Sequence, residues 1–295
     1  MSRKNKLEPF ENQIVEEYSK GKSTVELGKE YGVNAGSIYY CLKKNNVQVR
    51  NRSEAQRKYT IREDYFDKID TCHKAYILGL LYSDGCNSTE SNCVRIVLTA
   101  QDKHILEDIS SLIYVDHRNL TYRKGHEFVD KGKTYFSKDS CVFTINNKRI
   151  SENLCRWGVV KNKTQKIIFP TWLKPIYVSH FIRGYFDGDG SISISNCQAQ
   201  VSILGTKAFC TVLNKYLYDK GIKSSVCKGN SEITIYQICI HGNQCVRKFL
   251  EFVYDKADLY LSRKKMKSDK ILKIIPLAKR ETCKLCSMKH FAEEY

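Results

Sequence analysis

The chain contains a degenerate internal repeat, and this repeat constrains the fold more than any other feature of the sequence. The first copy opens with AYILGLLYSDG at residues 75–85, and the second opens with HFIRGYFDGDG at residues 180–190. Asp84 and Asp189 occupy the same place in the two copies, 105 positions apart (189 minus 84). A chain that repeats in this way is expected to fold as two similar units.

Both copies continue with the same order of elements. Strand-like segments alternate apolar and polar residues with period two, and segments with helical periodicity separate them. The matching strand candidates are 94–98 with 201–204, and 141–145 with 236–240. The sequence therefore predicts an α+β fold, with a first half-domain over residues 65–170 and a second over residues 171–275.

Small residues recur at a spacing of four in the helix that opens each copy, and so share one helical face. They are Ala75, Gly79 and Ser83 in the first copy, and Gly184 and Gly188 in the second. Small side chains allow two helices to approach closely, because the distance between the axes depends on the side chains at the contact. If the helices pack along these faces, Asp84 and Asp189 lie side by side at the same end.

Such a pair of acids favours a divalent cation. Two carboxylates about 4 Å apart repel by roughly 4 kcal/mol at an effective dielectric near 20, and a cation between them removes this cost. Oxygen ligands suit Mg²⁺ (or Mn²⁺), which takes one or two carboxylates together with phosphate oxygens and water. An ion held in this way can support phosphodiester hydrolysis.

Residues 77–85, ILGLLYSDG, and residues 182–190, IRGYFDGDG, resemble the nine-residue signature of the LAGLIDADG homing endonucleases, in their single-chain form with two motifs. The resemblance implies two pseudo-symmetric αββαββα half-domains that form a saddle-shaped sheet over DNA. It also implies double-strand cleavage that leaves short 3′ extensions. The metal-binding acid of the family is the eighth motif position, which falls on Asp84 and Asp189.

The sixth motif position departs from the family pattern in the first copy. It is Tyr82 there and Asp187 in the second copy, so we expect Tyr82 to pack and Asp187 to support the site. The resemblance also implies a basic residue near the end of each half, which orients water or offsets phosphate charge. The candidates are Lys163 and Lys264, with Lys161 and Lys265 as rivals.

Residues 1–46 form a separate helical segment in the sequence. Ser23 and Glu26 predict a capping box, and a third helix from about Ala35 to Asn45 is basic at its end. The pattern resembles a helix-turn-helix whose last helix reads the major groove, followed by a basic linker over residues 47–64. The alternative is a small helical unit with no nucleic-acid contact. The candidate DNA-binding residues here are Ser37, Tyr40, Lys43, Lys44, Arg50 and Arg52.

The charge of the chain favours a polyanionic partner. Lys and Arg number 49 against 32 Asp and Glu, a formal net charge of +17. Charge alone fits DNA, tRNA, ribosomes or an anionic membrane, because phosphate neutralisation releases counterions in each case. No apolar run is long enough for a membrane helix, and no signal peptide is visible. We expect an intracellular protein (cytoplasmic, or encoded by a phage or an organelle) that is not secreted, with reduced cysteines.

These features together predict a monomeric, Mg²⁺-dependent, site-specific DNA endonuclease. Because the two halves differ in sequence, the target is expected to be an asymmetric duplex of roughly 20 base pairs, read from the strands by amide and basic side chains. The strand candidates are Arg95, Arg123, Gln198, Gln200 and Lys228. Two alternatives stay open, a DNA-binding regulator that does not cut and an intron-RNA maturase on the same fold.

The last segment, residues 276–295, is expected to be a tail. Cys283 and Cys286 are spaced as zinc ligands, and His290 follows them, but no fourth ligand stands nearby in the sequence. The role of the two cysteines therefore stays open.

Overall fold

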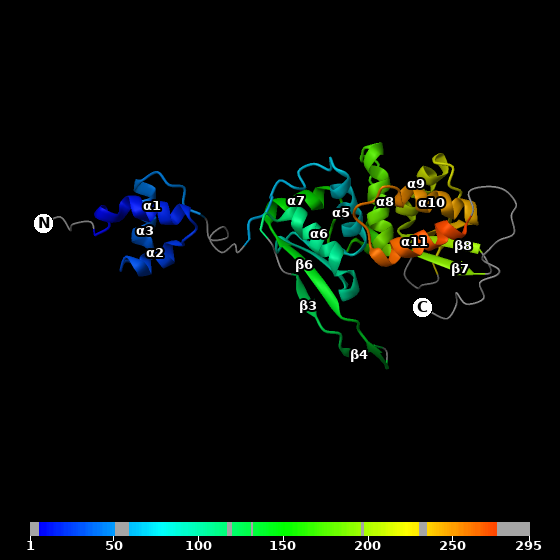
Figure 1. Cartoon of the computed structure of the whole chain (residues 1–295), viewed down its shortest axis with the longest axis horizontal. Coiled ribbons are helices and arrows are strands. Elements are labelled where there is room, and N and C mark those ends of the chain that lie inside the picture. Colours follow the sequence, from blue (N-terminus) through cyan, green and yellow to red (C-terminus); the bar gives the residue numbers. More distant parts are fainter. Residues whose placement is uncertain are drawn as a thin grey trace. The chain divides into compact units, whose positions relative to one another are not determined.

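The computed structural model describes residues 6–50, 59–116, 120–130, 132–195, 198–229 and 235–275. The chain divides into two compact units, Met1–Thr60 and Ile61–Tyr295, and each is described by itself (Figure 1). Arg52 and the tail over 276–295, with Cys283 and Cys286, lie outside the described residues.

Within residues 6–50 of the first unit, a short 3-10 helix, η1, is followed by three α-helices. Their bounds are Glu8–Phe10 for η1, Glu11–Ser19 for α1, Thr24–Glu30 for α2 and Ala35–Lys44 for α3. The capping box forms as expected, since the Ser23 side chain accepts from the Glu26 amide and the Glu26 carboxylate accepts from the Ser23 amide. Asn34 caps α3 in a similar way, by accepting from the amide of Ser37.

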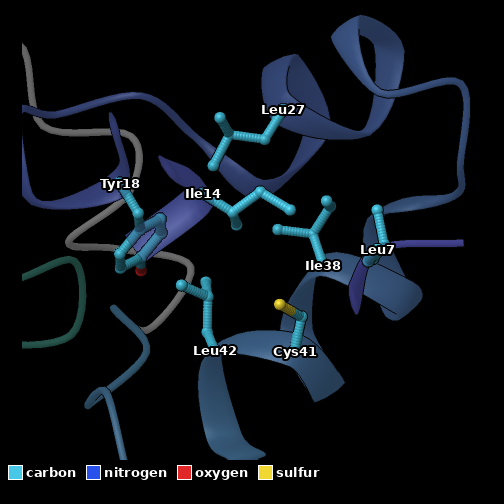
Figure 2. Close-up of a cluster of buried hydrophobic side chains, with 7 residues drawn as sticks. All are labelled: Leu7, Ile14, Tyr18, Leu27, Ile38, Cys41 and Leu42. Atoms are coloured by element: carbon cyan, nitrogen blue, oxygen red, sulfur yellow. The ribbon is translucent and has the colours of Figure 1, made fainter. Parts of the chain in front are cut away.

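A small apolar core holds these helices together, and Figure 2 shows its side chains converging from α1, α2 and α3 and from Leu7 before η1. Its members are Leu7, Ile14, Tyr18, Leu27, Ile38, Cys41 and Leu42. Val47 and Val49 pack against this core, and the Arg50 guanidinium donates to the carbonyls of Tyr18 and Gly21. The start of the segment expected as a linker is therefore part of the helical unit.

The first repeat folds as helix, two strands, helix, two strands and helix. Its elements are α5 (Cys72–Ser83), β1 (Gly85–Ser88), β2 (Cys93–Thr99), η2 (Ala100–Asp102), α6 (Lys103–Ile113), β3 (Thr121–Arg123), β6 (Ser140–Asn146) and α7 (Lys148–Arg156). The strands form one antiparallel sheet in the order β1-β2-β6-β3. A separate hairpin of β4 (Glu127–Asp130) and β5 (Lys133–Phe136) lies between β3 and β6 in the sequence.

The second repeat gives the same arrangement. Its elements are α8 (Pro175–Asp189), β7 (Gly190–Ser195), β8 (Gln198–Gly205), α9 (Lys207–Asp219), β9 (Ser225–Lys228), β10 (Tyr236–His241) and α10 (Asn243–Tyr254). A short helix, η3 (Lys163–Gln165), precedes this repeat, and α11 (Ser262–Ile274) follows it. The antiparallel sheet has the order β7-β8-β10-β9, which corresponds strand for strand to the first sheet.

The expected α+β fold with two αββαββα halves and a small helical segment before them is confirmed. In both sheets, alternate residues are buried under the helices, such as Val94 and Ile96 in β2 and Val201 and Ile203 in β8. Among the described residues, no helix combines the length and the apolar character needed to cross a membrane.

Candidate active site

Helices α5 and α8 pack against each other along their glycine faces, side by side in Figure 1. A methyl group added at Gly79 would lie 2.1 Å from the Phe181 carbonyl oxygen, and one added at Gly184 would lie 2.0 Å from that of Tyr76. The repeat equates 79 with 184 and 76 with 181, so the two contacts are reciprocal. Backbone therefore meets backbone at a distance that no residue larger than glycine permits.

The close contact brings the two motif acids to the same end of the helix pair. Asp84 caps the end of α5 and Asp189 is the last residue of α8. A methyl group at Gly188 would lie 2.4 Å from Oδ2 of Asp84, so the Asp84 carboxylate lies directly against the end of α8. The expected juxtaposition of the two acids is what the structure has.

The pKa of each carboxylate is raised above its ordinary value. Burial and then the negative charge of Asp84 raise the pKa of Asp189 to about 6. Burial also raises the pKa of Asp84, against the opposing effect of the positive charges of Lys264 and Lys163. Desolvation disfavours the ionised form of both acids, and like charge adds to this for Asp189.

Two lysines lie beside the acids, one from each half. The Lys163 ammonium donates to the carbonyl of Gly85, and the Lys264 ammonium donates to the carbonyl of Gly190 at 2.6 Å. Gly85 and Gly190 are equivalent in the repeat, so each lysine bonds to the residue that follows the acid of its own motif. Burial lowers the pKa of Lys163, and burial lowers that of Lys264 to about 8.

The rival lysines are engaged elsewhere. Lys161 forms an ion pair with Glu90 at 2.9 Å, and Lys265 forms one with Asp269 at 2.5 Å. Lys163 and Lys264, in contrast, are among the main groups that lower the pKa of both acids. The geometry therefore favours Lys163 and Lys264 as the basic residues of the site.

The two residues at the sixth motif position are both buried. Tyr82 packs edge-on against Phe181 and donates its hydroxyl to the Trp157 carbonyl at 2.5 Å. Asp187 accepts hydrogen bonds from the hydroxyls of Tyr76 and Tyr254 at 2.8 and 2.6 Å, and from the Leu261 amide at 2.8 Å. Tyr82 packs as expected, and Asp187 holds neighbouring elements together through these hydrogen bonds.

Three further residues bear on the acids and were not identified from the sequence. Tyr185 lowers the pKa of Asp189, although its hydroxyl donates to the Leu204 carbonyl at 2.8 Å. Ser83, whose hydroxyl donates to the Leu80 carbonyl at 3.0 Å, and the positive charge of Arg263 both lower the pKa of Asp84. A signal existed for Tyr185, because it lies four residues before Asp189 on the same helical face. Arg263 gave no separate signal, since it stands in a run of basic residues.

The strand candidates divide between the two faces of the sheets. The cross-strand pairs place Arg95 opposite Thr144 and Arg123 opposite Ser140, on the face away from the helices. Gln198 and Gln200 occupy the corresponding face of the second sheet. Lys228 differs, because it pairs with Tyr236 on the edge strand β9. The alternation of residues along the strands places it on the face that the helices cover.

The candidates in the first unit lie on or next to α3. Tyr40 is 74% exposed, and Lys43 is exposed with its ammonium over the Tyr39 ring. Lys44 forms an ion pair with Glu11 at 2.8 Å, and the Ser37 hydroxyl donates to the Asn34 side chain at 3.1 Å. Tyr40 and Lys43 are therefore the more accessible members of this set.

The donors at the acid pair fit a hard divalent cation. The site offers two carboxylates, and within the described part of the chain no group of three or more His, Cys, Asp or Glu side chains could hold a metal. Two carboxylates match the preference of Mg²⁺ for oxygen ligands, while zinc prefers nitrogen and sulfur ligands. A cation at this position would offset the effect by which the charge of Asp84 raises the pKa of Asp189.

Comparison with known proteins supports a LAGLIDADG-like domain. An uncharacterized protein of Methanocaldococcus jannaschii is 28% identical over 202 residues, covering 64% of this chain and 70% of that protein. Reverse gyrase of Thermococcus kodakarensis is 25% identical over 184 residues, which cover 61% of this chain and 9% of that protein.

Solved structures with a related trace include full-length DUF199/WhiA from Thermotoga maritima, which is 15% identical with a TM-score of 0.41 and covers 74% of this chain and 66% of that chain. The meganuclease I-SmaMI bound to uncleaveable DNA is 11% identical with a TM-score of 0.44 and covers 68% of this chain and 89% of that chain. Residues 177–254, which run from α8 to the end of α10, match the family model described as the LAGLIDADG-like domain. The second repeat is thus a LAGLIDADG-like domain.

Proposed function

We propose that this protein is a site-specific endonuclease that hydrolyses both strands of duplex DNA. The observation that carries the proposal is the reciprocal packing of α5 and α8, which brings Asp84 and Asp189 together with Lys163 and Lys264. Two acids and two bases arranged by a pseudo-two-fold suit a substrate with two antiparallel strands.

Asp84 and Asp189 would hold a Mg²⁺ or Mn²⁺ ion between them. Such an ion, when bound, supplies a polarised water and stabilises the charge on the phosphate oxygens. The carboxylates supply the negative charge that attracts it, and Tyr185 and Ser83 favour the ionised forms of Asp189 and Asp84 by lowering their pKa. The site is half-enclosed, which strengthens these interactions.

The lysines would act on the phosphates. An ammonium has three N–H groups, so the bond from Lys163 to the Gly85 carbonyl leaves donors for a phosphate oxygen or a water. Lys264 is 7% exposed and donates to the carbonyls of Phe186 and Gly190, so it is fixed more firmly than Lys163. Each stabilises negative charge as it develops in the strand nearest to it.

The open faces of the two sheets would lie on the DNA. Arg95, Arg123, Gln198 and Gln200 are the candidates for contact with base edges, because basic and amide side chains recognise bases bidentately. The net charge of +17 supplies the attraction to phosphate. We propose that the first unit is a helix-turn-helix that extends this recognition, with Tyr40 and Lys43 of α3 toward the duplex.

A cleavage assay tests the proposal. The full-length protein is incubated with a plasmid library that carries a randomised insert, in the presence of Mg²⁺, and cut products are sequenced. We expect Asp84→Asn and Asp189→Asn to lower the cleavage rate by roughly 10³-fold or more, as for loss of a main catalytic group. Asp219→Asn, which removes another aspartate at the end of a helix, is the matched control and should cut like the wild type.

Binding is measured in parallel with Ca²⁺ in place of Mg²⁺. Both site variants should bind the selected duplex as the wild type does, with an affinity that falls steeply as salt rises. Cleavage at equal rates by the site variants and the wild type would remove the proposed mechanism. Binding without any cleavage by the wild type would favour a DNA-binding regulator, and preference for structured RNA would favour a maturase.

A further inference from the structure

The two motif helices carry different residues at their sixth position, a hydroxyl donor in α5 and a carboxylate acceptor in α8. Both residues contact the segment that leads to the lysine of their own half. Tyr82 and Asp187 correspond in the repeat, since 187 minus 82 is again 105. Each is almost fully buried, and each makes a hydrogen bond to main-chain atoms a few residues before the lysine of its own half. A buried polar side chain needs such a partner, so these bonds are fixed features of the core.

In the first half, the Tyr82 hydroxyl donates to the carbonyl of Trp157, the residue that ends α7. The next residue, Gly158, has a φ of +97°, and a methyl group there would lie 2.1 Å from the Tyr82 hydroxyl oxygen. The tyrosine therefore lies against the turn by which the chain leaves α7. Lys163 follows five residues after this turn (163 minus 158), and its ammonium returns to the Gly85 carbonyl.

In the second half, the link is shorter. Oδ2 of Asp187 accepts from the Leu261 amide at 2.8 Å, and the Leu261 carbonyl accepts from the Lys264 amide at 3.0 Å in the first turn of α11. The Lys264 ammonium then returns to the carbonyls of Phe186 and Gly190, on either side of Asp187. Asp187, Leu261 and Lys264 therefore form a closed loop of hydrogen bonds that ties α11 to α8.

We propose that Tyr82 and Asp187 are positioning residues, each of which places the lysine of its own half beside the acid pair by holding the main chain that leads to it. The proposal rests on the proposed endonuclease function only for its effect on cleavage. Tyr82 donates to a main-chain carbonyl and Asp187 accepts from a main-chain amide. Both therefore hold the main chain, one as a donor and the other as an acceptor. An aspartate at position 82 could not replace Tyr82 in this contact, because its side chain is shorter and an ionised carboxylate has no hydrogen to donate to the Trp157 carbonyl.

The test uses strand-specific cleavage. Each strand of the selected duplex carries its own label, and single-turnover rates are measured for both strands with saturating full-length protein. Tyr82→Phe removes only the hydroxyl, and Asp187→Asn removes one of the two acceptor oxygens. Because the lysines belong to opposite halves, we expect Tyr82→Phe to slow one strand about 10-fold and Asp187→Asn to slow the other, with binding in Ca²⁺ unchanged.

Tyr254→Phe is the matched control for the second half. It removes the hydrogen bond to Oδ1 of Asp187 and leaves the Oδ2 bond to Leu261 in place. The ratio of the two strand rates should stay at the wild-type value in this variant. Equal slowing of both strands in Tyr82→Phe and Asp187→Asn, or a shift of the ratio in the same direction, would overturn the proposal.

Hydrogen exchange of the metal-free protein tests the same inference without cleavage. We expect faster amide exchange over residues 157–163 in Tyr82→Phe and over residues 261–265 in Asp187→Asn, each at least 10-fold and confined to its own half. Unchanged exchange in these segments would end the positioning role. A wild type that does not cut would sink the endonuclease proposal, while the exchange result would still decide the positioning role.

Discussion

The two halves share the same glycine contact between their motif helices and differ in the buried residues around it. The reciprocal contacts of Gly79 and Gly184 repeat almost to the tenth of an ångström, at 2.1 and 2.0 Å. The halves differ three residues beyond each motif acid. In the first half Asn87 is buried in a polar network, whereas its counterpart Ile192 in the second half is a buried apolar residue. The parts that bring the acids together are thus the same, and the parts around them have diverged.

The difference shows which contacts have no substitute. A backbone-to-backbone helix contact has a single solution, glycine, because any side chain would lie within the opposite main chain. A core position beside it has several solutions, provided that volume and hydrogen bonds are satisfied. Asn87 satisfies its site by donating to the carbonyls of Ser151 and Val159, both at 2.9 Å, whereas Ile192 needs no partner.

The largest expected effect concerns the glycine contact between α5 and α8. Gly79→Ala and Gly184→Ala should each lower the free energy of unfolding by about 3 kcal/mol or more, because the added methyl group overlaps a carbonyl oxygen that belongs to a rigid helix. Chemical denaturation of the two variants measures this. If the halves are equivalent here, the two losses agree within experimental error. Tolerance of one alanine and not the other would break the comparison.

A smaller effect is expected where the halves differ. Asn87→Ala should lower the free energy of unfolding by about 2 kcal/mol, since it leaves two buried carbonyls and the Ser151 hydroxyl without their partner. A double-mutant cycle with Ser151→Ala should give a coupling of about 1 kcal/mol through the hydrogen bond of 2.7 Å between their side chains. Strictly additive losses would show that the network does not act as a unit.

The acids themselves are expected to titrate unequally. The folded-state pKa of Asp189, about 6, lies above its usual value of 3.8, so the folded protein binds this proton more tightly than the unfolded one. The unfavourable contribution is fully present above pH 6 and disappears as the pH falls from about 6 to 3.8. The metal-free protein should therefore gain stability over that window relative to Asp189→Asn.

Thermal melts from pH 7 to 4 measure how the stability of the metal-free protein depends on pH. Saturating Mg²⁺ should reduce this dependence, because a cation at the pair favours the ionised form. Asp84→Asn should also reduce it, since the charge of Asp84 contributes to the shift of Asp189. A pH dependence that is identical in the wild type and Asp189→Asn would contradict the assignment of the shift to this residue.

The smallest expected effect on stability concerns the hairpin of β4 and β5, which among the described residues occurs in the first half alone. All eight residues of β4 and β5 are exposed, and Phe128 stacks on Tyr135 with ring centroids 5.7 Å apart. Replacement of residues 127–136 by a short Gly-Ser link should change the free energy of unfolding by less than about 0.5 kcal/mol. Binding to DNA should weaken, which a titration in Ca²⁺ detects. A drop of several degrees in Tm would show that the hairpin supports the fold.

Much of the fold followed from the sequence, because its signals are local or repeat. The capping box at Ser23 and Glu26, the period-two strands and the glycine faces each have one physical reading, and each is present. The hairpin was not predicted, since residues 127–136 are polar and aromatic without clear alternation. Helix α11 was not predicted either, because its basic sequence has no strong apolar face until the fold provides one.

The candidate site was predictable only as far as the motif extends. Asp84 and Asp189 follow from their place in the repeat, and the fold brings them together. The partners of Asp187 could not be predicted, since Tyr254 and Leu261 lie 67 and 74 residues away and nothing local pairs them with it. Lys228 illustrates another limit, because a one-residue difference in register decides which face of a sheet a side chain occupies.

The reciprocal glycine contact has a consequence for how such a molecule changes over time. Gly79 meets the main chain of α8 and Gly184 meets that of α5, so each half supplies both the space and the surface that the other half requires. A substitution at either glycine therefore acts on the main chain of the opposite half, and a compensating change would have to occur there. The two halves are thus constrained as a pair at these positions.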